Sequence, residues 1–392
     1  MNPVLSIIIP TRNRGIYCIE AIKSILRIPD QDIELIVQDN SDNTILKELV
    51  EQNVFDNRLK YFYSPQQLSS IDNFNKAFEE ANGRYLCLIG DDDGIIPEIL
   101  RVARWANSKG IESVCSSVYV GYAWPGVYKV FNTGALSIPH YSNEIKFQKP
   151  LEILPKLLRN GFLDYYKFNL PRVYHGLVKR SCMEEIKHKT GKFVGGLSPD
   201  IYTTVGLSGI VRNHVILNIP FTISGVCNSS TSADSSRQKH CGNLEDAPHF
   251  RSIVRYQWEP EIPQYYSVQT IWAETGIKSI KENGIPISLK WFSLEKMIAG
   301  SLISSYSITS LILEKTKQHL NKQNFHFSFI YIKILFHILL LILSQVPQKI
   351  MNARLRIIPS KRIIYNIPDI SQATSRIGEI FNQEKYRFLD NF

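Results

Sequence analysis

The sequence predicts an α/β protein with a mostly parallel sheet, helices on both of its faces and a helical C-terminal region. Short apolar, β-branched runs alternate with helical patterns over residues 1–115, which is typical of strand–helix–strand units. Several of these runs end in polar residues, as expected where ligands bind at the carboxyl ends of parallel strands. From about residue 250 onward the pattern is helical.

The elements of the first half follow one another in a regular order. Apolar runs predict strands, and apolar residues three or four apart predict helices. A proline at position 10 is expected to stop the first strand, and Gly83 to stop the third helix. The expected strands are 4–9, 33–37, 59–63 and 85–89; the expected helices are 16–28, 45–54 and 69–81, with another from Pro97 and one from Pro199.

Cysteine usage and charge narrow the class of protein. The 392 residues include six cysteines with no C-x-x-C pair, which excludes a zinc ribbon or a thioredoxin-like motif and indicates a reducing cytosol. Residues 315–368 contain nine of the 45 basic residues and no acid, so the remaining chain is balanced at 36 basic and 36 acidic residues. A basic tract beside an apolar run favours contact with anionic lipid over nucleic acid.

An acidic triplet, Asp91–Asp93, follows the apolar run 85–89. Three adjacent carboxylates repel one another where water is scarce, so either a cation neutralises them or water reaches them. Mg²⁺ or Mn²⁺ suits such hard oxygen ligands and can in turn hold a diphosphate. The alternative is a solvated acidic turn that caps the following helix. The position at the end of a parallel strand favours the metal site.

Two further segments suit a nucleotide. The segment Ser6–Arg14 leads from a strand into a turn with two arginines before a helix, a place that suits phosphate. Asp39 ends the second strand, where a carboxylate can accept hydrogen bonds from a base or a ribose. Neither segment is specific alone, because such junctions often carry polar residues and Asp39 could equally cap the next helix.

Together the three segments resemble the family 2 glycosyltransferases, which have the GT-A fold. The family's opening strand typically reads S-[IV]-[IV]-[IV]-P-T-x-N-R, which Ser6–Arg14 matches closely. Val37–Ser41 is similar to the family's acidic turn, and Gly90–Asp93 to its metal motif. The resemblance covers residues 4–100 and fades beyond 120. Gly90 stands where the commoner D-x-D-D form has its first acid, which leaves open which aspartate binds the metal directly.

The resemblance implies particular roles for these residues. Asp39 would contact the nucleobase, and Mn²⁺ or Mg²⁺ would be held at Asp92 and Asp93. The whole donor-nucleotide site would consist of Pro10, Thr11, Arg12, Arg14, Asp39, Asn40, Asp91 and Asp92. Residues 1–115 would form the nucleotide-sugar-binding half of a GT-A domain, 116–245 its acceptor-binding half, and 246–392 a helical C-terminal region with a membrane-associating segment.

The family also needs a general base, usually a carboxylate near the start of a helix. Asp200 is the best candidate, because two glycines precede it, Pro199 suits a first helical turn, and the carboxylate falls at the helix start. The alternative is a helix-start aspartate stabilised by the helix dipole. Asp164 and the pair Glu184–Glu185 are weaker candidates, the pair because it lies in a charged helix surface. A cluster of rings, Tyr165, Tyr166, Tyr174 and His175, would either stack on a sugar or serve packing.

The segment 325–346 is mostly apolar and 22 residues long, nearly enough to span a bilayer. Its polar residues His326, Lys333, His337 and Ser344 fall on one narrow helical stripe at about 100° per residue. An apolar helix with a polar stripe and basic flanks fits the membrane interface. A buried core helix or a true span are the alternatives, and Lys333 near the middle counts against a span.

We therefore expect an inverting glycosyltransferase, of hexosyl or N-acetylhexosaminyl type, with a nucleotide-sugar donor, by preference a UDP-sugar. The acceptor would be a hydroxyl of a lipid-linked bacterial glycan, as in O-antigen, lipopolysaccharide or capsule assembly. No signal-peptide pattern is visible, so the protein would lie in the cytoplasm, peripherally on the inner face of the cell membrane, and bind no nucleic acid. One alternative is a non-catalytic glycan- or nucleotide-binding module on the same scaffold. Another is a sugar nucleotidyltransferase, which needs a glycine-rich loop where residues 5–15 have only Gly15.

Overall fold

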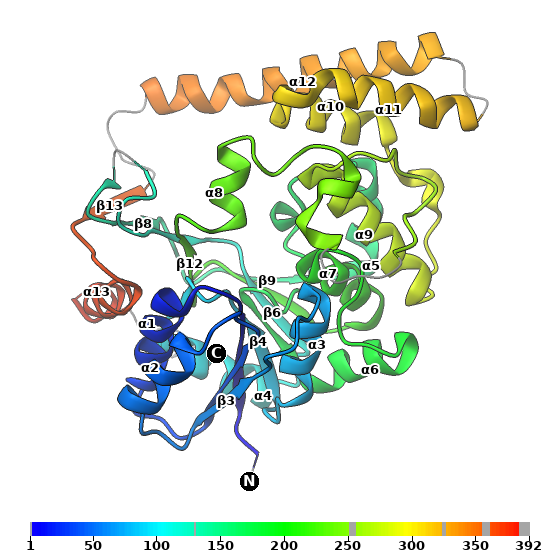
Figure 1. The fold of residues 1–392 in the computed structure, drawn as a ribbon. Helices are drawn as coiled ribbons and strands as arrows, with labels where there is room; N and C mark the ends of the chain where they lie inside the picture. Colours follow the sequence, from blue (N-terminus) through cyan, green and yellow to red (C-terminus); the bar gives the residue numbers. More distant parts are fainter. Residues whose placement is uncertain (1, 129–130, 251–255, 324–326, 355–360, 384–392) are drawn as a thin grey trace.

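The computed structural model describes residues 2–128, 131–250, 256–323, 327–354 and 361–383. Two sheets form the lower and middle part of the molecule in Figure 1, and a layer of helices lies above them. The larger sheet has eight strands and the smaller sheet has five.

The larger sheet is mostly parallel, as predicted. Its order is β3-β2-β1-β4-β10-β6-β11-β9, and of these strands β10 and β9 run against the other six. The strands are β1 (Leu5–Thr11), β2 (Ile33–Asp39), β3 (Leu59–Tyr63), β4 (Tyr85–Leu88), β6 (Ser113–Ser116), β9 (Ile145–Gln148), β10 (Gly176–Lys179) and β11 (His214–Leu217).

Helices cover both faces of this sheet because side chains alternate along each strand. Leu5, Ile7 and Ile9 of β1 pack in one core cluster with α1 and α4, whereas Ile8 belongs to a second cluster with α3, α6 and α7. These apolar contacts on both faces explain why the β1 run is continuously apolar. The helices around the sheet are α1 (Gly15–Leu26), α2 (Ile45–Asn53), α3 (Ser70–Glu79), α4 (Glu98–Ser108), α5 (Pro150–Arg159), α6 (Arg180–Thr190) and α7 (Pro199–Ile210).

Strand β1 runs two residues beyond its expected end, through Pro10 to Thr11. Proline lacks an N–H group, but the nitrogen of Pro10 faces the β4 side, where strand pairing has already ended at Ile8 opposite Leu88. On the β2 side, the carbonyl of Thr11 still accepts a hydrogen bond from the Asn40 amide (3.0 Å). The expectation that Pro10 stops the strand was therefore wrong, since no sheet hydrogen bond is lost there.

The smaller sheet was not predicted. Its order is β13-β8-β7-β12-β5, with β5 (Gly94–Ile95), β7 (Val120–Ala123), β8 (Ala135–Pro139), β12 (Thr222–Val226) and β13 (Lys361–Tyr365). Strand β13 comes from the C-terminal region, and α13 (Ile370–Gln383), which follows it, packs against α1. The C-terminal region is thus mainly helical, as expected, and also returns to the first half of the chain.

The helical layer has its own core. It contains α9 (Val268–Glu282), α10 (Leu294–Ser304), α11 (Thr309–Lys322) and α12 (Phe327–Arg354), which pack with α5 and α7. A short helix, α8 (Thr231–Ser236), lies between the smaller sheet and α12 (Figure 1). Among the described residues, no single helix has the length and apolar character to cross a membrane; the bent pair Leu294–Ser304 and Tyr306–Lys322 meets those two criteria jointly, with an angle of 102°.

Candidate active site

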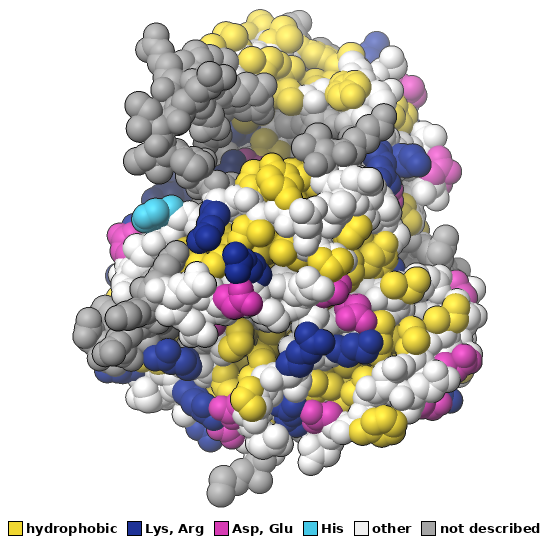
Figure 2. Space-filling model, turned by 90° about the vertical axis from the view of Figure 1, so that its left-hand side faces the viewer, with side chains coloured by type: hydrophobic (Ala, Val, Ile, Leu, Met, Phe, Trp, Pro, Cys, Tyr) yellow, Lys and Arg dark blue, Asp and Glu magenta, His cyan; other side chains and the backbone are white. Residues whose placement is uncertain are grey.

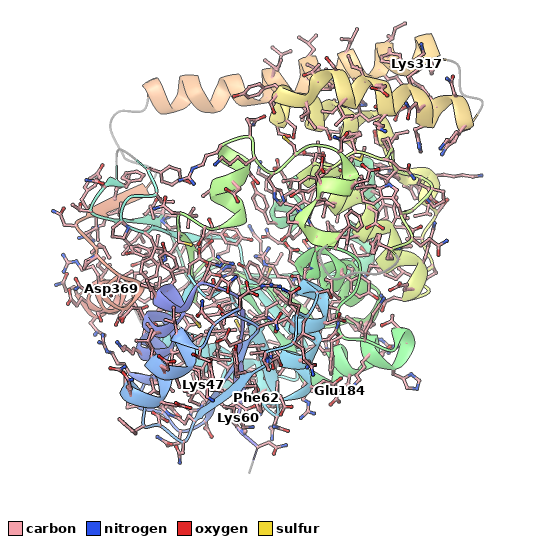
Figure 3. The ribbon with its side chains drawn as sticks, viewed as in Figure 1. Lys47, Lys60, Phe62, Glu184, Lys317 and Asp369 are labelled. Atoms are coloured by element: carbon pink, nitrogen blue, oxygen red, sulfur yellow. The ribbon has the colours of Figure 1, made fainter. Side chains whose placement is uncertain are left out.

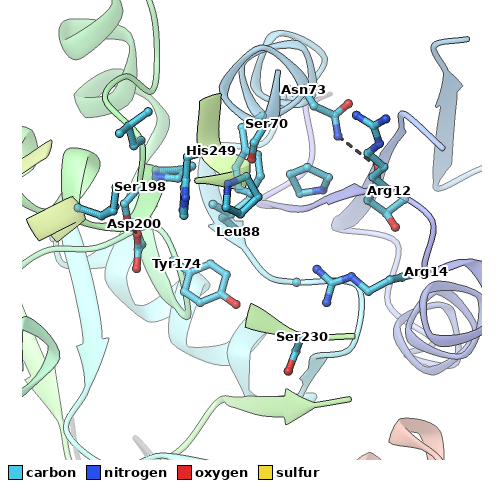
Figure 4. Close-up of a pocket in the computed structure, with 18 of the residues that line it drawn as sticks. Arg12, Arg14, Ser70, Asn73, Leu88, Tyr174, Ser198, Asp200, Ser230 and His249 are labelled. Carbon is cyan, nitrogen blue, oxygen red and sulfur yellow. Dashed lines mark hydrogen bonds between the residues drawn. The ribbon is translucent and has the colours of Figure 1, made fainter. Parts of the chain in front are cut away.

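A cavity of about 580 Å³ lies at the carboxyl ends of β1, β2 and β4. Its walls come from the strand ends on one side and from α7 and α9 on the other. Figure 4 shows Arg12 and Arg14 on one side, Ser198 and Asp200 on the other, and Tyr174 between them. The cavity brings together seven of the residues predicted from the sequence: Pro10, Thr11, Arg12, Arg14, Asn40, Asp92 and Asp200.

The turn after β1 places its two arginines differently. The Arg14 guanidinium lies 3.2 Å from Asp91 (Nε–Oδ1) and 3.6 Å from Asp92 (Nη1–Oδ1). The Arg12 side chain instead pairs with Asp42 (2.8 Å), whose carboxylate is half exposed. Arg14 therefore supplies positive charge beside the triplet, and Arg12 supplies it at the edge of the cavity.

Asp91 and Asp93 are both buried beneath the cavity and do not line it. Asp91 accepts a hydrogen bond from Thr11 Oγ1 (2.6 Å). Asp93 accepts hydrogen bonds from the amides of Gly90 (2.6 Å) and Gly225 (2.7 Å) and from the Tyr174 hydroxyl (3.0 Å). His175 Nε2 lies 3.1 Å from the same carboxylate. Burial raises the pKa of Asp93, but the His175 contact and the two amides outweigh burial and hold that pKa below its usual value.

Asp92 is the member of the triplet that lines the cavity. Its Oδ2 accepts a hydrogen bond from the Cys227 amide (3.1 Å). Burial, together with the neighbouring Asp93 and Asp91, raises the pKa of Asp92 to about 7. Burial also raises the pKa of Asp91, against the effect of Arg14. A carboxylate at a cavity wall whose charged form is destabilised by burial and by neighbouring acids is suited to bind a divalent cation.

The carboxylate oxygens of Asp91 and Asp92 fit a divalent cation for which the protein supplies only some of the ligands. Asp91 Oδ1 is buried and has no hydrogen-bond partner, although it lies near Arg14. Within the described part of the chain, no three His, Cys, Asp or Glu side chains converge on one point where an ion could bind. Asp92, with Asp91 behind it, could therefore hold Mg²⁺ or Mn²⁺ when a diphosphate supplies further oxygen ligands. Asp93 is already fully engaged with protein donors.

Asp39 is fully buried and does not line the cavity. Its two oxygens accept hydrogen bonds from the Ser41 amide (2.8 Å) and the Tyr61 hydroxyl (2.6 Å). Its neighbour Asn40 lines the cavity, and the Asn40 side chain donates to the backbone carbonyl of Ser64 (2.8 Å). The contact of Asp39 with a nucleobase stays a prediction, and its present role is to fix the turn after β2.

Asp200 lies in the first turn of α7, where Pro199 begins the helix. Its Oδ2 accepts a hydrogen bond from the Tyr165 hydroxyl (2.5 Å), and its Oδ1 accepts one from Ser198. Gly196 in the preceding loop has φ +65°, and a Cβ there would lie 2.5 Å from Thr275 of α9. The glycine therefore lets the loop pack closely on α9, which fixes where Asp200 enters the cavity.

The weaker base candidates lie elsewhere. The Asp164 carboxylate is half exposed, pairs with Lys167 (2.7 Å) and does not line the cavity. Glu184 and Glu185 pair with Arg180 and Lys189 on the exposed surface of α6, as the sequence predicted.

Several residues of the site were missed or were given another role. Tyr165, Tyr174 and His175 were expected to stack on a sugar or to serve packing, but their polar atoms contact Asp200 and Asp93. His249 lines the cavity and stands near Asp200 in Figure 4. The amides of Gly225 and Cys227 are backbone groups, which any sequence possesses, so no sequence signal could have revealed them.

A cavity at the ends of parallel strands, with arginine and aspartate on one wall and a single carboxylate on the other, is typical of an enzyme that transfers a group from an anionic donor. The model of glycosyl transferase family 2 matches residues 6–155, which include β1, β2 and the aspartate triplet. Residues 6–155 thus match a glycosyl transferase family 2 domain, as the motifs predicted, and the α/β fold is the expected one.

Curated relatives support the same family. A glucosyltransferase of Campylobacter jejuni, named GalNAc(5)-diNAcBac-PP-undecaprenol beta-1,3-glucosyltransferase, is 31% identical over 114 residues, which are 29% of this chain and 37% of that protein. The glycosyltransferase GlyG of Streptococcus pneumoniae is 26% identical over 183 residues, or 43% of this chain and 61% of that protein. The chain thus covers less than two thirds of either relative. Among solved structures, residues 1–349 of TarS from S. aureus, in complex with UDP-GlcNAc, align with 81% of this chain and 92% of that one, at 13% identity and a TM-score of 0.44.

Proposed function

We propose that the protein is an inverting glycosyltransferase that moves a sugar from a nucleotide-sugar donor, a UDP-sugar in the first instance, to a hydroxyl group. The observation that carries this proposal is that Arg14, Asp92 and Asp200 line one cavity, in which Arg14 lies opposite Asp200 (Figure 4). Residues 1–115 would hold the donor and residues 116–245 most of the acceptor. A non-catalytic binding module would have no need for a carboxylate opposite the donor wall.

The donor wall would bind the nucleotide diphosphate. Arg14 would neutralise phosphate oxygens, and Pro10, Thr11, Arg12 and Asn40 would line the nucleotide. Mg²⁺ or Mn²⁺ bound at Asp92 would supply further positive charge for the departing diphosphate. These residues would stabilise the charge that develops on the leaving group. Such electrostatic stabilisation of the transition state is usually the largest single contribution to the rate enhancement.

Asp200 would act as the general base on the acceptor. Its carboxylate would take the proton of the acceptor hydroxyl as that oxygen attacks the anomeric carbon. The new bond to the acceptor oxygen forms while the bond to the diphosphate oxygen breaks, so one displacement inverts the anomeric centre. The hydroxyls of Tyr165 and Ser198 would hold the carboxylate in position.

We further propose that the acceptor is a lipid-linked glycan, of the kind used in O-antigen, lipopolysaccharide or capsule assembly. The name of the Campylobacter relative describes an undecaprenol-linked acceptor. The basic, apolar segment near the C-terminus favours a place at a lipid surface. The protein would lie in the cytoplasm, peripherally on the inner face of the membrane.

The substitution Asp200→Asn tests the catalytic role. Asparagine keeps the shape but cannot take the proton, so sugar transfer should fall at least about 100-fold while donor affinity stays unchanged. Transfer is measured with a panel of nucleotide sugars in the presence of Mn²⁺ and a membrane extract, and donor affinity by calorimetry.

The matched control is Asp164→Asn, which changes an exposed aspartate outside the cavity and should leave transfer unchanged. Near-normal transfer by the Asp200→Asn variant would contradict the assignment of the base. Lost donor binding with unchanged turnover at saturation would place Asp200 in the donor pocket.

A further inference from the structure

Helix α12 has an inner face that packs on the protein. Ile330 and Ile334 are buried against the helical layer, chiefly against α10. Beside this inner face, Lys333 Nζ pairs with Glu295 Oε1 of α10 (3.1 Å). Tyr331, Ile338 and Leu341 also pack at the edge of this core. Of the polar stripe expected from the sequence, Lys333 is held by α10, Ser344 is exposed, and His326 lies outside the described residues.

The outer face of α12 is apolar and exposed. Eight large apolar side chains there are between 45% and 65% exposed: Phe329, Ile332, Leu335, Phe336, Leu339, Leu340, Ile342 and Leu343. At about 100° per residue they cover a sector of about 160° that contains no polar residue between positions 329 and 344. A continuous apolar surface of this size is uncommon on a water-facing helix and indicates a binding surface.

The outer face of α12 is a ridge at one end of the molecule. In Figure 1, α12 lies across the top, above α10 and α11. Figure 2 shows hydrophobic side chains gathered at that same end. Figure 3 places Lys317 there as well, whereas Lys47 and Lys60 lie at the opposite end of the molecule. A broad ridge fits a flat partner better than it fits a single peptide segment.

The charge of the sequence near α12 distinguishes between two flat partners, a second copy of this chain and an anionic lipid surface. The sequence around the ridge, residues 315–368, carries nine basic residues and no acid. Two copies of this chain meeting through the ridge would bring two basic segments together and repel each other, whereas anionic lipid headgroups would neutralise them.

We propose that the outer face of α12 lies flat in the interface of an anionic lipid bilayer, with the helix axis parallel to the membrane and the basic residues around it on lipid headgroups. This inference specifies the membrane location proposed above and rests on that proposed function. Its test does not require sugar transfer. The apolar side chains enter the boundary between headgroups and acyl chains, as in other in-plane amphipathic helices.

The test is flotation of the full chain with vesicles of phosphatidylcholine alone or of equal parts phosphatidylcholine and phosphatidylglycerol. The wild-type protein should float with the anionic vesicles, and less so with neutral vesicles or at high salt. The variant Ile332→Glu/Phe336→Glu should bind the anionic vesicles at least about tenfold less, because both charges would enter the lipid interface. The matched control is Phe55→Glu/Phe147→Glu, which changes two apolar residues that are 88% and 76% exposed outside α12 and should float like the wild type.

Thermal melting with UDP and Mn²⁺ accompanies every variant and separates the two ideas. Lost flotation with an unchanged UDP-induced shift confirms the ridge as the lipid contact. No flotation of the wild type, or a wild-type dimer that the α12 variant alone dissociates, would overturn the proposal and assign the ridge to another occupant. Flotation without any nucleotide-sugar binding would leave the ridge standing and overturn the proposed function.

Discussion

At the scale of single residues, three adjacent aspartates have three different environments. Asp91 contacts Thr11 and Arg14, Asp93 accepts three hydrogen bonds and lies beside His175, and of the three only Asp92 lines the cavity. Sequence order could not separate them, because all of their partners except Gly90 lie between 77 and 135 residues away along the chain.

This difference predicts opposite effects for two similar substitutions. Asp92→Asn should abolish the thermal shift that UDP produces with Mn²⁺ while the fold remains as stable as the wild type, because a strained buried charge is removed. Asp93→Asn should cost about 3 kcal/mol of unfolding free energy, since its buried donors lose a charged acceptor. Denaturant titration and melting with and without Mn²⁺ measure both. A stable Asp93→Asn variant without metal-dependent binding would reverse the assignment.

A second residue-scale prediction concerns Tyr165, which donates to Asp200 across 35 residues of sequence. Burial and the nearby Asp200 raise the pKa of Tyr165 well above its ordinary value, so the phenol stays a donor. Tyr165→Phe removes one hydrogen bond to a charged group, a loss on the order of 1.5–3 kcal/mol. Turnover should fall about ten- to a hundredfold while the KM for the donor stays constant. A raised donor KM with normal turnover would show that Tyr165 serves the donor site instead.

At the scale of elements, the sequence predicted the strands and helices that are encoded by a local pattern of apolar residues. The strands β1 to β4, the helices α1 to α3 and the start of α7 at Pro199 all lie within three residues of their expected positions, since each is encoded by neighbouring apolar and capping residues. The smaller sheet escaped prediction because β5 has only two residues, and because glycine, serine or proline interrupts the apolar runs of β7, β8 and β12. The pairing of β13 with β8 joins residues more than 220 positions apart, which no local pattern can encode.

Helix α9 carries a buried acid with a pH-dependent effect on stability. Glu274 is fully buried, accepts hydrogen bonds from the Tyr256 hydroxyl (2.7 Å), and burial raises its pKa from 4.5 to about 7. The folded state therefore keeps a proton that the unfolded state loses above pH 4.5. The free energy of unfolding should fall by about 3 kcal/mol as the pH rises from 4.5 through 7.

The variant Glu274→Gln isolates this contribution, because an amide does not titrate. Urea unfolding followed between pH 4.5 and 8 should show a flatter pH profile in the variant than in the wild type. Glu184, which pairs with Arg180 on the exposed surface of α6 (2.9 Å), provides the control: Glu184→Gln should keep the slope assigned to Glu274. An unchanged profile in the Glu274→Gln variant would contradict the raised pKa.

At the scale of the whole molecule, the last described helix belongs to the core of the first half. Ile370, Ile377 and Phe381 of α13 are buried in the same cluster as Cys18 and Ile22 of α1. The Tyr122 hydroxyl donates to the Ile367 carbonyl (2.8 Å), and Arg27 contacts Ser371. A truncation that removes the apolar segment 325–346 together with residues up to 392 would therefore also remove core residues. A loss of solubility in that variant would say nothing about lipid binding.

The closure of the chain on its first half gives a prediction that point substitutions can test. Ile377→Ala should cost about 2–5 kcal/mol of unfolding free energy, because it leaves a cavity in the α1–α13 contact. Gln372→Ala, an exposed change on the same helix, should cost less than about 0.5 kcal/mol. Chemical unfolding followed by tryptophan fluorescence reports on this region, since Trp124 lies in the same core cluster. If α13 completes the proposed donor-binding half, Ile377→Ala moves the unfolding transition to lower denaturant concentration. UDP binding then weakens only at denaturant concentrations where the folded fraction also falls. If α13 were an appendage, the substitution would leave the transition unchanged.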